Sequence, residues 1–370
     1  MRTALLLSIP YDPKIEEEVR LGRQPLPDYL ALAQRLDATL LTPIRYGRQP
    51  TTGLGKALGF VRTAWAGFRV RHRYDAIISD IDRVGLILAL LLKLTRSRTR
   101  HVVICHSKMM HPLDSNVVRL LRLYTHIHRL VCYGPEAAEL VARKIPALAD
   151  RIVVVRHGQD HRFWQAQGAQ ERQIVVSAGL FRRDFDTLIE AVDGLSATVE
   201  VAAHSPWVTG GAAQPRSLPS NVTFRRHDYE GLRTLYDQAL VVAVPLMPTH
   251  SQAGSLVVYE AMAMGKPVIV TRTEGQASLR LVEEGVTGYY VEPHDVARWR
   301  ELIQRFLDDP GAAREMGRRA RERVEAALNL EAYAEEMARV VCDVPETVPS
   351  AIEVQAATAS DGAPTLAPKP

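Results

Sequence analysis

Short runs of β-branched residues alternate along the chain with stretches in which apolar residues recur every three or four positions. The first pattern predicts buried strands and the second predicts amphipathic helices. The two kinds of element alternate from Thr3 to Cys342. Such an alternation needs a parallel sheet that is covered by helices on both faces. The predicted fold class is therefore α/β.

The predicted elements are listed here by residue number. Strands are expected at 3–9, 38–42, 75–79, 101–105, 130–133, 151–155, 173–177, 197–203, 221–224, 241–245, 267–271 and 288–291. Helices are expected at 27–36, 56–70, 84–94, 116–123, 135–143, 185–192, 232–240, 256–264, 279–284, 295–308, 310–327 and 330–342.

The alternation is interrupted once, at the polar stretch Gln165–Arg172. A single core stops growing near ~250–300 residues, so a chain of 370 residues is expected to form two domains. We expect Rossmann-like, doubly wound domains over 1–164 and 173–328 and a closing helix over 329–342. Residues 343–370 contain many prolines and alanines and no aromatic residue, which predicts a disordered tail.

Composition limits the function classes. The chain is 46% apolar and 24% charged, as soluble globular proteins are. Its 46 basic and 42 acidic residues nearly balance, so no nucleic-acid partner is expected. The apolar run Val84–Leu92 is far shorter than the ~20 residues of a membrane span. The spacing of the three cysteines indicates neither a disulfide framework nor a zinc site, and a reducing cytoplasm is the expected location. No metal and no cofactor are expected.

Basic residues gather in one part of the first domain. Arg69, Arg71 and Arg73 precede the strand 75–79, and the helix 56–70 before them carries Trp65. A basic, aromatic-bearing surface can rest on anionic lipid. We prefer a solvated face, and keep a weak peripheral contact with the inner membrane face as the alternative.

The stretch 250–275 contains the most informative pattern. A strand ends near Pro245, and the loop after it passes Gln252 and Gly254 before a helix begins. Ligands of parallel sheets bind at the carboxyl ends of the strands. Gly254 permits close approach of the backbone, and the N–H groups of Ser255 and Leu256 at the helix start would attract an anion. The sequence therefore predicts a phosphate site here.

The residues that follow carry a family resemblance. Glu260 and Ala261–Ile269 (AMAMGKPVI) resemble the signature of retaining GT-B glycosyltransferases of family 4, the group 1 glycosyl transferases. The resemblance implies two Rossmann-like domains facing across a cleft, with the nucleotide-sugar donor on the second. It also implies that Glu260 binds the donor ribose. Gln252, eight positions earlier, would contact the donor sugar where the family usually has glutamate.

Further motifs extend the resemblance. The stretch 177–191 (SAGLFRRDFDTLIEA) is similar to the family segment in which an arginine and a lysine hold the donor diphosphate. By resemblance, Arg182 and Arg183 take these roles, and guanidinium groups suit the charge that builds on a leaving diphosphate. His106 follows a strand where the family has a histidine near the donor sugar. Arg151–Asp160 is similar to the family's domain junction, with His157 in place of asparagine.

The chain departs from the family at two places. Gln252 is uncharged, and the loop after the first strand, Ile9–Pro13, lacks the usual pair of glycines. These departures keep a non-catalytic sugar-nucleotide-binding protein open as an alternative. Sugar-nucleotide 2-epimerases share the architecture and are a second alternative. A third is the metal-dependent GT-A class, because Asp80-Ile81-Asp82 matches its D-x-D motif.

The expected activity is transfer of a hexosyl group from a nucleoside diphosphate sugar to an acceptor hydroxyl with retention of configuration. His106, Arg182 and Arg183 are the predicted catalytic residues, and Gln252, Gly254, Ser255, Leu256 and Glu260 the predicted donor-binding residues. The sequence leaves the acceptor open among a glycolipid, a polysaccharide and a small metabolite.

Overall fold

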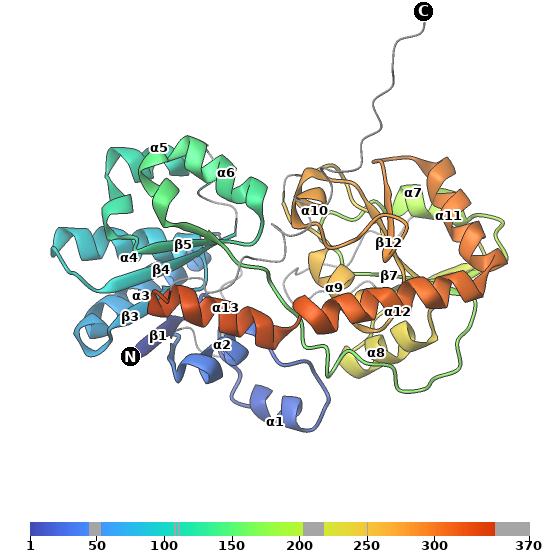
Figure 1. Cartoon of the computed structure of the whole chain (residues 1–370), viewed down its shortest axis with the longest axis horizontal. Coiled ribbons are helices and arrows are strands. Elements are labelled where there is room, and N and C mark those ends of the chain that lie inside the picture. The colour runs from blue at the N-terminus through green and yellow to red at the C-terminus, as the bar shows by residue number, and fades with distance from the viewer. Residues whose placement is uncertain (44–52, 107–108, 110–111, 203–217, 250, 345–370) are drawn as a thin grey trace, which may run out of the picture.

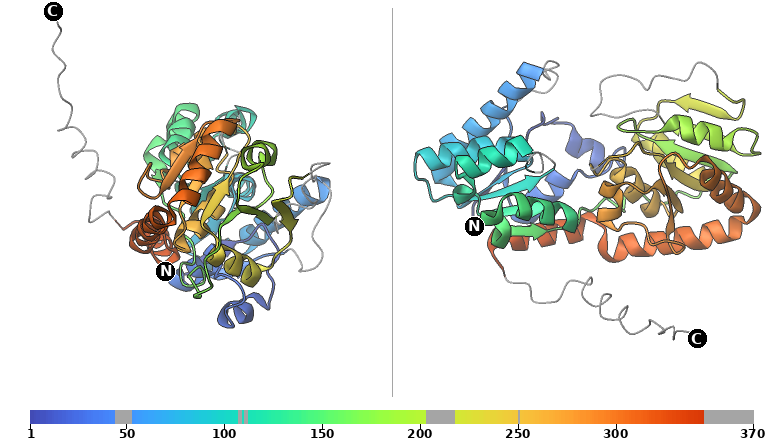
Figure 2. Two further views of the ribbon diagram at one scale, coloured as in Figure 1. Left: turned by 90° about the vertical axis from the view of Figure 1, so that its right-hand side faces the viewer. Right: turned by 90° about the horizontal axis from the view of Figure 1, so that it is seen from above.

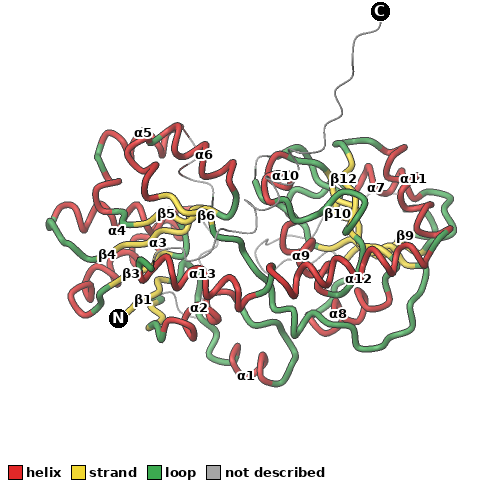
Figure 3. Tube along the Cα trace, in the orientation of Figure 1, coloured by secondary structure: helices red, strands yellow, loops and turns green. Residues whose placement is uncertain are grey.

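The computed structural model describes residues 1–43, 53–106, 109, 112–202, 218–249 and 251–344. The described residues form two parallel six-stranded sheets, each with helices on both faces (Figures 1 and 3). The predicted α/β class and the two doubly wound sheets are confirmed. Most of the connection between the predicted strands 197–203 and 221–224 lies outside the described residues, as does the predicted tail from residue 345 onward.

The first sheet has the strand order β2-β1-β3-β4-β5-β6. Its strands are β1 (Thr3–Leu6), β2 (Thr39–Leu41), β3 (Ala76–Ser79), β4 (Arg100–Cys105), β5 (Arg129–Cys132) and β6 (Ile152–Val154). Its helices are α1 (Ile15–Arg20), α2 (Asp28–Leu36), α3 (Gly53–Val70), α4 (Asp82–Leu94), α5 (Pro112–Leu120) and α6 (Pro135–Lys144). Short 3₁₀ turns lie at Arg71–Arg73, Leu123–His126 and Pro146–Arg151.

The second sheet has the order β12-β11-β10-β7-β8-β9. Its strands are β7 (Ile174–Ala178), β8 (Thr198–Ala202), β9 (Val222–Arg225), β10 (Val241–Val244), β11 (Val268–Thr271) and β12 (Gly288–Val291). The helices of this half are α7 (Phe185–Val192), α8 (Tyr229–Gln238), α9 (Ser255–Ala263), α10 (Glu274–Leu279), α11 (Val296–Asp308), α12 (Pro310–Ala327) and α13 (Leu330–Cys342).

Local sequence signals, such as capping residues, predicted most of these helices and strands. Pro310 is the first residue of α12, and the Asn329 side chain accepts a hydrogen bond from Ala332 N at the start of α13, as capping preferences predict. Helix α1 was not predicted. The helix predicted at 279–284 is wrong, because α10 begins earlier and ends at Leu279. Thr273 caps its start and Arg280 ends it in a left-handed conformation (φ 48°).

Helix α13 returns to the first domain, as expected from the resemblance (Figure 1). It packs along α2, and Tyr333, Met337 and Val341 join the core beside Leu5. The described part of the chain continues two residues, Asp343 and Val344, into the region predicted as tail. Asp343 ends α13 and accepts a 2.7 Å hydrogen bond from His128 on the first domain.

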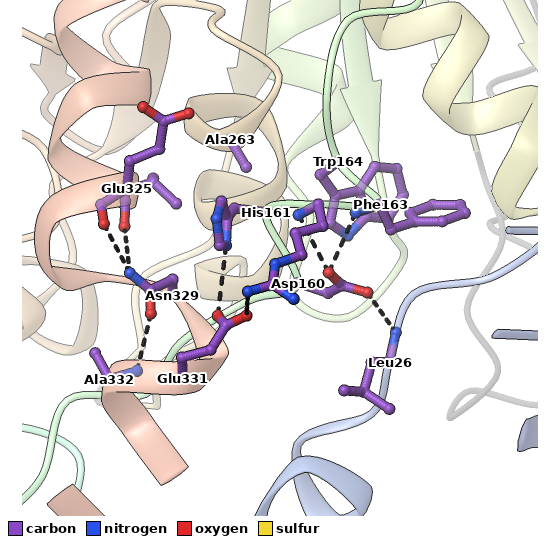
Figure 4. Close-up of polar contacts among 12 residues, drawn as sticks. Leu26, Asp160, His161, Phe163, Trp164, Ala263, Glu325, Asn329, Glu331 and Ala332 are labelled. Carbon is purple, nitrogen blue, oxygen red and sulfur yellow. Dashed lines mark hydrogen bonds and ion pairs between the residues drawn. The ribbon is translucent and has the colours of Figure 1, made fainter. Parts of the chain in front are cut away.

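The chain crosses between the domains twice, and the two crossings lie side by side. Gln159 N donates to Leu328 O at 3.2 Å, and Leu330 N donates to Gln159 O at 3.1 Å. A Cβ on Gly158 would lie 2.0 Å from Asn329 O, so this approach requires glycine. The two crossings therefore move as one junction (Figure 4).

Side chains tie this junction to both halves. Asp160 accepts a 2.7 Å hydrogen bond from Leu26 N of the first half (Figure 4). Arg321 of α12 donates to the carbonyl oxygens of His161 and Trp164 at 2.8 and 2.6 Å. The relative position of the two sheets is thus set by direct hydrogen bonds. No helix in the described part of the chain is long and apolar enough to cross a membrane.

Candidate functional site

The second sheet reverses its direction of winding between β7 and β10, where open α/β sheets bind ligands. The segments that follow these two strands meet there. Arg183 comes five residues after the end of β7, and Gly254 directly precedes α9. A Cβ on Gly254 would lie 3.4 Å from Arg183 Nη1. Arg183 and Gly254 belong to two different motifs, both of which were predicted to form one site. The structure places the two residues next to each other.

The Arg183 guanidinium lies against two glycines. Its Nε donates to Ala178 O at 2.8 Å and its Nη1 to Phe181 O at 3.1 Å. A Cβ on Gly179 would lie 2.7 Å from Nη2. Gly179 and Gly254 both have φ of +83°, which side chains rarely adopt. Backbone carbonyls and the two glycines together hold the guanidinium in one place.

Arg183 keeps a positive charge in this partly buried position. Burial lowers its pKa to about 10, while the charges of Tyr236 and Glu260 act to raise it. The guanidinium is thus protonated at neutral pH. Among the described residues it forms no direct ion pair with a carboxylate, so its charge can serve an anion in the space beside Gly254.

Glu260 lies on α9 about one and a half turns after the start of the helix. The hydroxyl of the fully buried Tyr236, on α8, donates a 3.0 Å hydrogen bond to Glu260 Oε2. Burial raises the pKa of Glu260 to about 7, and the hydrogen bond from Tyr236 and the charge of Arg183 partly oppose the rise. Near neutral pH its carboxyl group therefore changes readily between an acceptor and a donor form.

Helix α10 packs against the loop that precedes α9. Gln276 Nε2 donates to Ala253 O at 2.6 Å, and a Cβ on Gly275 would lie 1.9 Å from Ser251 O. Helix α9 starts at Gly254 with no side-chain cap. The Ser255 N–H donates to Gln252 O at 3.2 Å and the Val258 N–H to Gly254 O at 3.1 Å. The N–H groups of Leu256 and Val257 between them have no acceptor among the described residues and are available to an anion. The actual position of α10, earlier than predicted, is what fixes this loop.

The other predicted residues of this domain differ in exposure. Gln252 and Ser255 are half-buried in the loop. The Leu256 side chain is 41% exposed, so only its backbone N–H can serve the anion site. Arg182 is exposed in a left-handed conformation (φ 57°), and its side chain has no hydrogen bond or ion pair among the described residues. Arg183 is the fixed member of the pair.

His106 follows β4 at the carboxyl edge of the first sheet. Its Nε2 donates to the backbone oxygen of Asp80 at 3.0 Å. Solvent reaches the ring, but protein atoms crowd most of its sides, and this burial lowers its pKa. His106 is therefore neutral at pH 7, with Nδ1 left as a hydrogen-bond acceptor.

A row of rings leads from His106 to the second domain. The ring centroids of His106 and Tyr133 are 5.5 Å apart, those of Tyr133 and His157 5.2 Å, and those of His157 and Tyr259 5.9 Å. Tyr259 precedes Glu260 on α9. The structure thus places His106 and the donor-side residues on facing elements of the two domains.

Sequence reasoning missed the partners of His157. Its Nε2 donates to Asp28 Oδ2 at 3.2 Å, and Tyr333 of α13 packs on its ring with centroids 5.2 Å apart. Burial alone would raise the pKa of Asp28, but its hydrogen bond and charge interaction with His157 lower it overall. His157 was noted only as a replacement for asparagine. Asp28 and Tyr333 lie in segments without any motif.

The D-x-D carboxylates serve the first sheet. Asp80 Oδ2 accepts hydrogen bonds from Ser8 N and Ser8 Oγ at 2.6 and 2.7 Å, which joins the ends of β3 and β1. Asp82 is fully buried and accepts from Met109 N at 3.3 Å. No group of three or more ligating side chains that could hold a metal ion occurs among the described residues.

A cavity of about 810 Å³ opens elsewhere, beside the domain junction. Its walls include Gln24, Arg35, Arg162, Arg233 and Glu331. None of the eight predicted site residues lines it, and Arg35 and Arg162 are paired with Glu335 and Glu331 at 2.6 and 2.8 Å. The cavity is separate from the Arg183 site.

Residues 160–323 match the family of glycosyl transferases group 1. The chain is 26% identical to a D-inositol 3-phosphate glycosyltransferase of Streptomyces avermitilis over 302 residues, or 72% of this chain and 64% of that protein. It is 36% identical to an Arthrobacter protein of the same name over 97 residues, or 24% and 23% of the two chains. These matches support a glycosyltransferase of group 1.

Solved structures agree in fold. Sucrose-phosphate synthase of Thermosynechococcus elongatus superposes with a TM-score of 0.64 at 22% identity, over 83% of each chain. Anabaena Alr3699/HepE in complex with UDP and glucose superposes with a TM-score of 0.68 at 16% identity, over 93% of this chain and all of that one. The two facing domains of the chain have the GT-B fold.

Proposed function

We propose that the protein transfers a hexosyl group from a nucleoside diphosphate sugar to an acceptor hydroxyl, with retention of configuration, as a family 4 enzyme. One observation carries the proposal: Arg183 lies against Gly179 and Gly254 at the switch point of the second sheet, beside the uncapped start of α9. A fixed cation and free N–H groups at one place suit a diphosphate.

The remaining residues have roles that follow from their positions. Glu260, oriented by Tyr236, would accept the ribose hydroxyls, and Gln252 would contact the donor sugar. The neutral His106, on the facing domain, would accept a hydrogen bond from a sugar hydroxyl at Nδ1. Leu256 would supply its free backbone N–H group, and Ser255 would supply its own only by giving up its 3.2 Å hydrogen bond to Gln252 O. The exposed Arg182 would join the diphosphate only when donor is bound.

The proposed reaction uses positioning and charge stabilisation. The bond between the sugar C1 and the diphosphate oxygen breaks while the acceptor oxygen bonds to C1 on the same face. The acceptor proton passes to the departing diphosphate oxygen. Arg183 and the α9 N-terminus stabilise the charge that develops there. This route needs neither a covalent carboxylate nucleophile nor a metal ion.

The donor is proposed to be a UDP-sugar, because the Anabaena neighbour was solved with UDP and glucose. The acceptor, a glycolipid, polysaccharide or small metabolite, would lie on the first domain near His106. We place the protein in the bacterial cytoplasm. Its relatives among the curated proteins are glycosyltransferases, although the match covers only 23% and 64% of the two described above.

The test is a thermal-shift panel of nucleoside diphosphates and their sugars, followed by product analysis by NMR with the best binder. A product whose anomeric configuration equals that of the donor is the expected result. Release of an epimerised donor without acceptor would identify an isomerase instead. Nucleotide binding with neither transfer nor slow donor hydrolysis would identify a binding protein.

A further inference from the structure

Helix α3 is packed with its small residues inward. Its buried residues are Gly59, Thr63, Ala64 and Gly67. A Cβ on Gly67 would lie 2.7 Å from a methyl carbon of Leu6, so the helix lies very close to β1. An amphipathic helix normally buries its large apolar side chains. Helix α3 packs Phe60 and Phe68, both half-buried, against the core, but leaves other large apolar side chains outside it.

Four large apolar side chains of α3 face solvent. Leu54, Leu58, Val61 and Trp65 are 74%, 48%, 47% and 49% exposed. Their spacing of four, three and four residues places them on one helix face, which we call the apolar stripe. Figure 2 shows α3, in blue, projecting from the first domain in both views. No described segment covers the stripe.

The charge around the stripe has one sign. Helix α3 contains no acidic residue, and its exposed side chains include Lys56, Arg62 and Arg69. Residues 53–130 contain 14 lysines and arginines against four aspartates and no glutamate, whereas the whole chain carries only +4. One of those aspartates, Asp82, is fully buried. The surface of this part of the chain is therefore strongly cationic.

We propose that α3 docks on an anionic lipid surface, with the apolar stripe inserted among the acyl chains and the flanking cations on the headgroups. The positive charge of this surface favours an anionic partner. The continuous apolar face with a tryptophan favours a bilayer over a nucleic acid, because a nucleic acid would contact the cations but not the apolar stripe. This inference stands apart from the proposed transferase activity, since none of the Arg183 site residues takes part.

Cosedimentation of the full chain with phosphatidylcholine vesicles, with and without phosphatidylglycerol, tests the proposal. Binding is expected only with phosphatidylglycerol and should weaken with salt. Leu58→Gln/Trp65→Gln should weaken it by at least about tenfold at unchanged charge, because each side chain loses its burial. The control Leu21→Gln/Val344→Gln removes two apolar side chains, each 51% exposed, elsewhere and should leave it unchanged.

A second set of variants tests the contribution of the positive charges to vesicle binding. Arg62→Glu/Arg69→Glu changes the two exposed cations that lie beside the stripe on the helix surface and should abolish binding. Lys14→Glu/Arg20→Glu, an equal charge change on α1 and its N-cap, should only reduce it. Tryptophan emission should shift to the blue on vesicles, and Trp65→Phe should remove the shift. Three results would overturn the proposal. The first is undiminished binding of Leu58→Gln/Trp65→Gln, and the second is an equal loss of binding in its control, Leu21→Gln/Val344→Gln. The third is tighter binding of the protein to a single-stranded RNA than to vesicles.

Discussion

Tyr236 donates a 3.0 Å hydrogen bond to Glu260 Oε2, and the two side chains come from different helices, α8 and α9. Tyr236 is fully buried, so its hydroxyl has little freedom. The Glu260 carboxyl group is consequently held in one orientation, on the helix whose start forms the proposed diphosphate site. The packing of Tyr236 in the second domain therefore sets the orientation of Glu260, the proposed contact to the nucleotide-sugar donor.

Tyr236→Phe should weaken donor binding without abolishing turnover. Loss of a hydrogen bond to a carboxylate costs about 1–2 kcal/mol, or roughly a 5- to 30-fold rise in donor KM with kcat little changed. The hydrogen bond also lowers the Glu260 pKa, so the pH at which donor affinity develops should move upward. Tyr229→Phe is the matched control, because Glu260 accepts its tyrosine hydrogen bond from Tyr236 and not from Tyr229, and this variant should leave both quantities unchanged.

Donor affinity should rise with pH through about 7, where Glu260 ionises and becomes a full acceptor for ribose hydroxyls. Stability of the free protein should change in the opposite direction. The folded pKa lies above the ordinary value of 4.5, so this contribution is present below pH 4.5 and is lost as the pH rises to about 7. Asp80, whose pKa burial raises to about 7, acts in the same sense.

Calorimetric titration and thermal unfolding across this pH range measure the two trends. Glu260→Gln should flatten the affinity profile fully and the stability profile only in part, since Asp80 remains. A stability profile that steepens in Glu260→Gln would contradict the assignment of the raised pKa to Glu260.

The sequence predicted those parts of the site that local patterns encode. Arg183 and Gly254 each follow a strand in a recognisable motif, and strands with carboxyl ends at one edge bring their loops together. Tyr236 and Asp28 had no such signal, because each meets its partner only after distant helices pack. The same reason explains α10: Thr273 caps it, but its position also depends on Gly275 lying against Ser251.

Gly254→Ala should impair both folding and nucleotide binding. The φ of +83° alone costs about 1–2 kcal/mol for a side chain. The new Cβ would also lie 2.8 Å from Val244 Cγ1 and would contact Arg183. Gly194→Ala is the control, because Gly194 has φ of +75° with nothing within 4 Å of its Cβ position. Equal effects of both variants on nucleoside diphosphate affinity would show that Gly254 contributes only its backbone conformation.

The two neighbouring arginines should differ strongly. Arg183→Ala should reduce kcat/KM by about 100-fold or more, since a preorganised charge at the leaving group is lost. Arg182→Ala should have a much smaller effect, because its exposed side chain must be ordered at each donor binding. Steady-state kinetics with the best donor measure both, with circular dichroism as the check on folding. A larger loss in Arg182→Ala would exchange the two roles.

Asp28→Asn should weaken the contact between the first domain and the junction. Asp28 is more than a third exposed, so the expected loss at pH 7 is only about 1 kcal/mol. Because its folded pKa is lowered from 3.8, the wild-type advantage is present above pH 3.8 and disappears as the pH falls through the folded pKa. Glu335→Gln, which breaks the exposed pair with Arg35, is the control and should change stability by less. Urea unfolding of the wild type and the two variants at neutral and acid pH measures these differences in the free energy of unfolding. If the wild type remains as much more stable than Asp28→Asn in acid as at neutral pH, the role of the Asp28 carboxylate is contradicted.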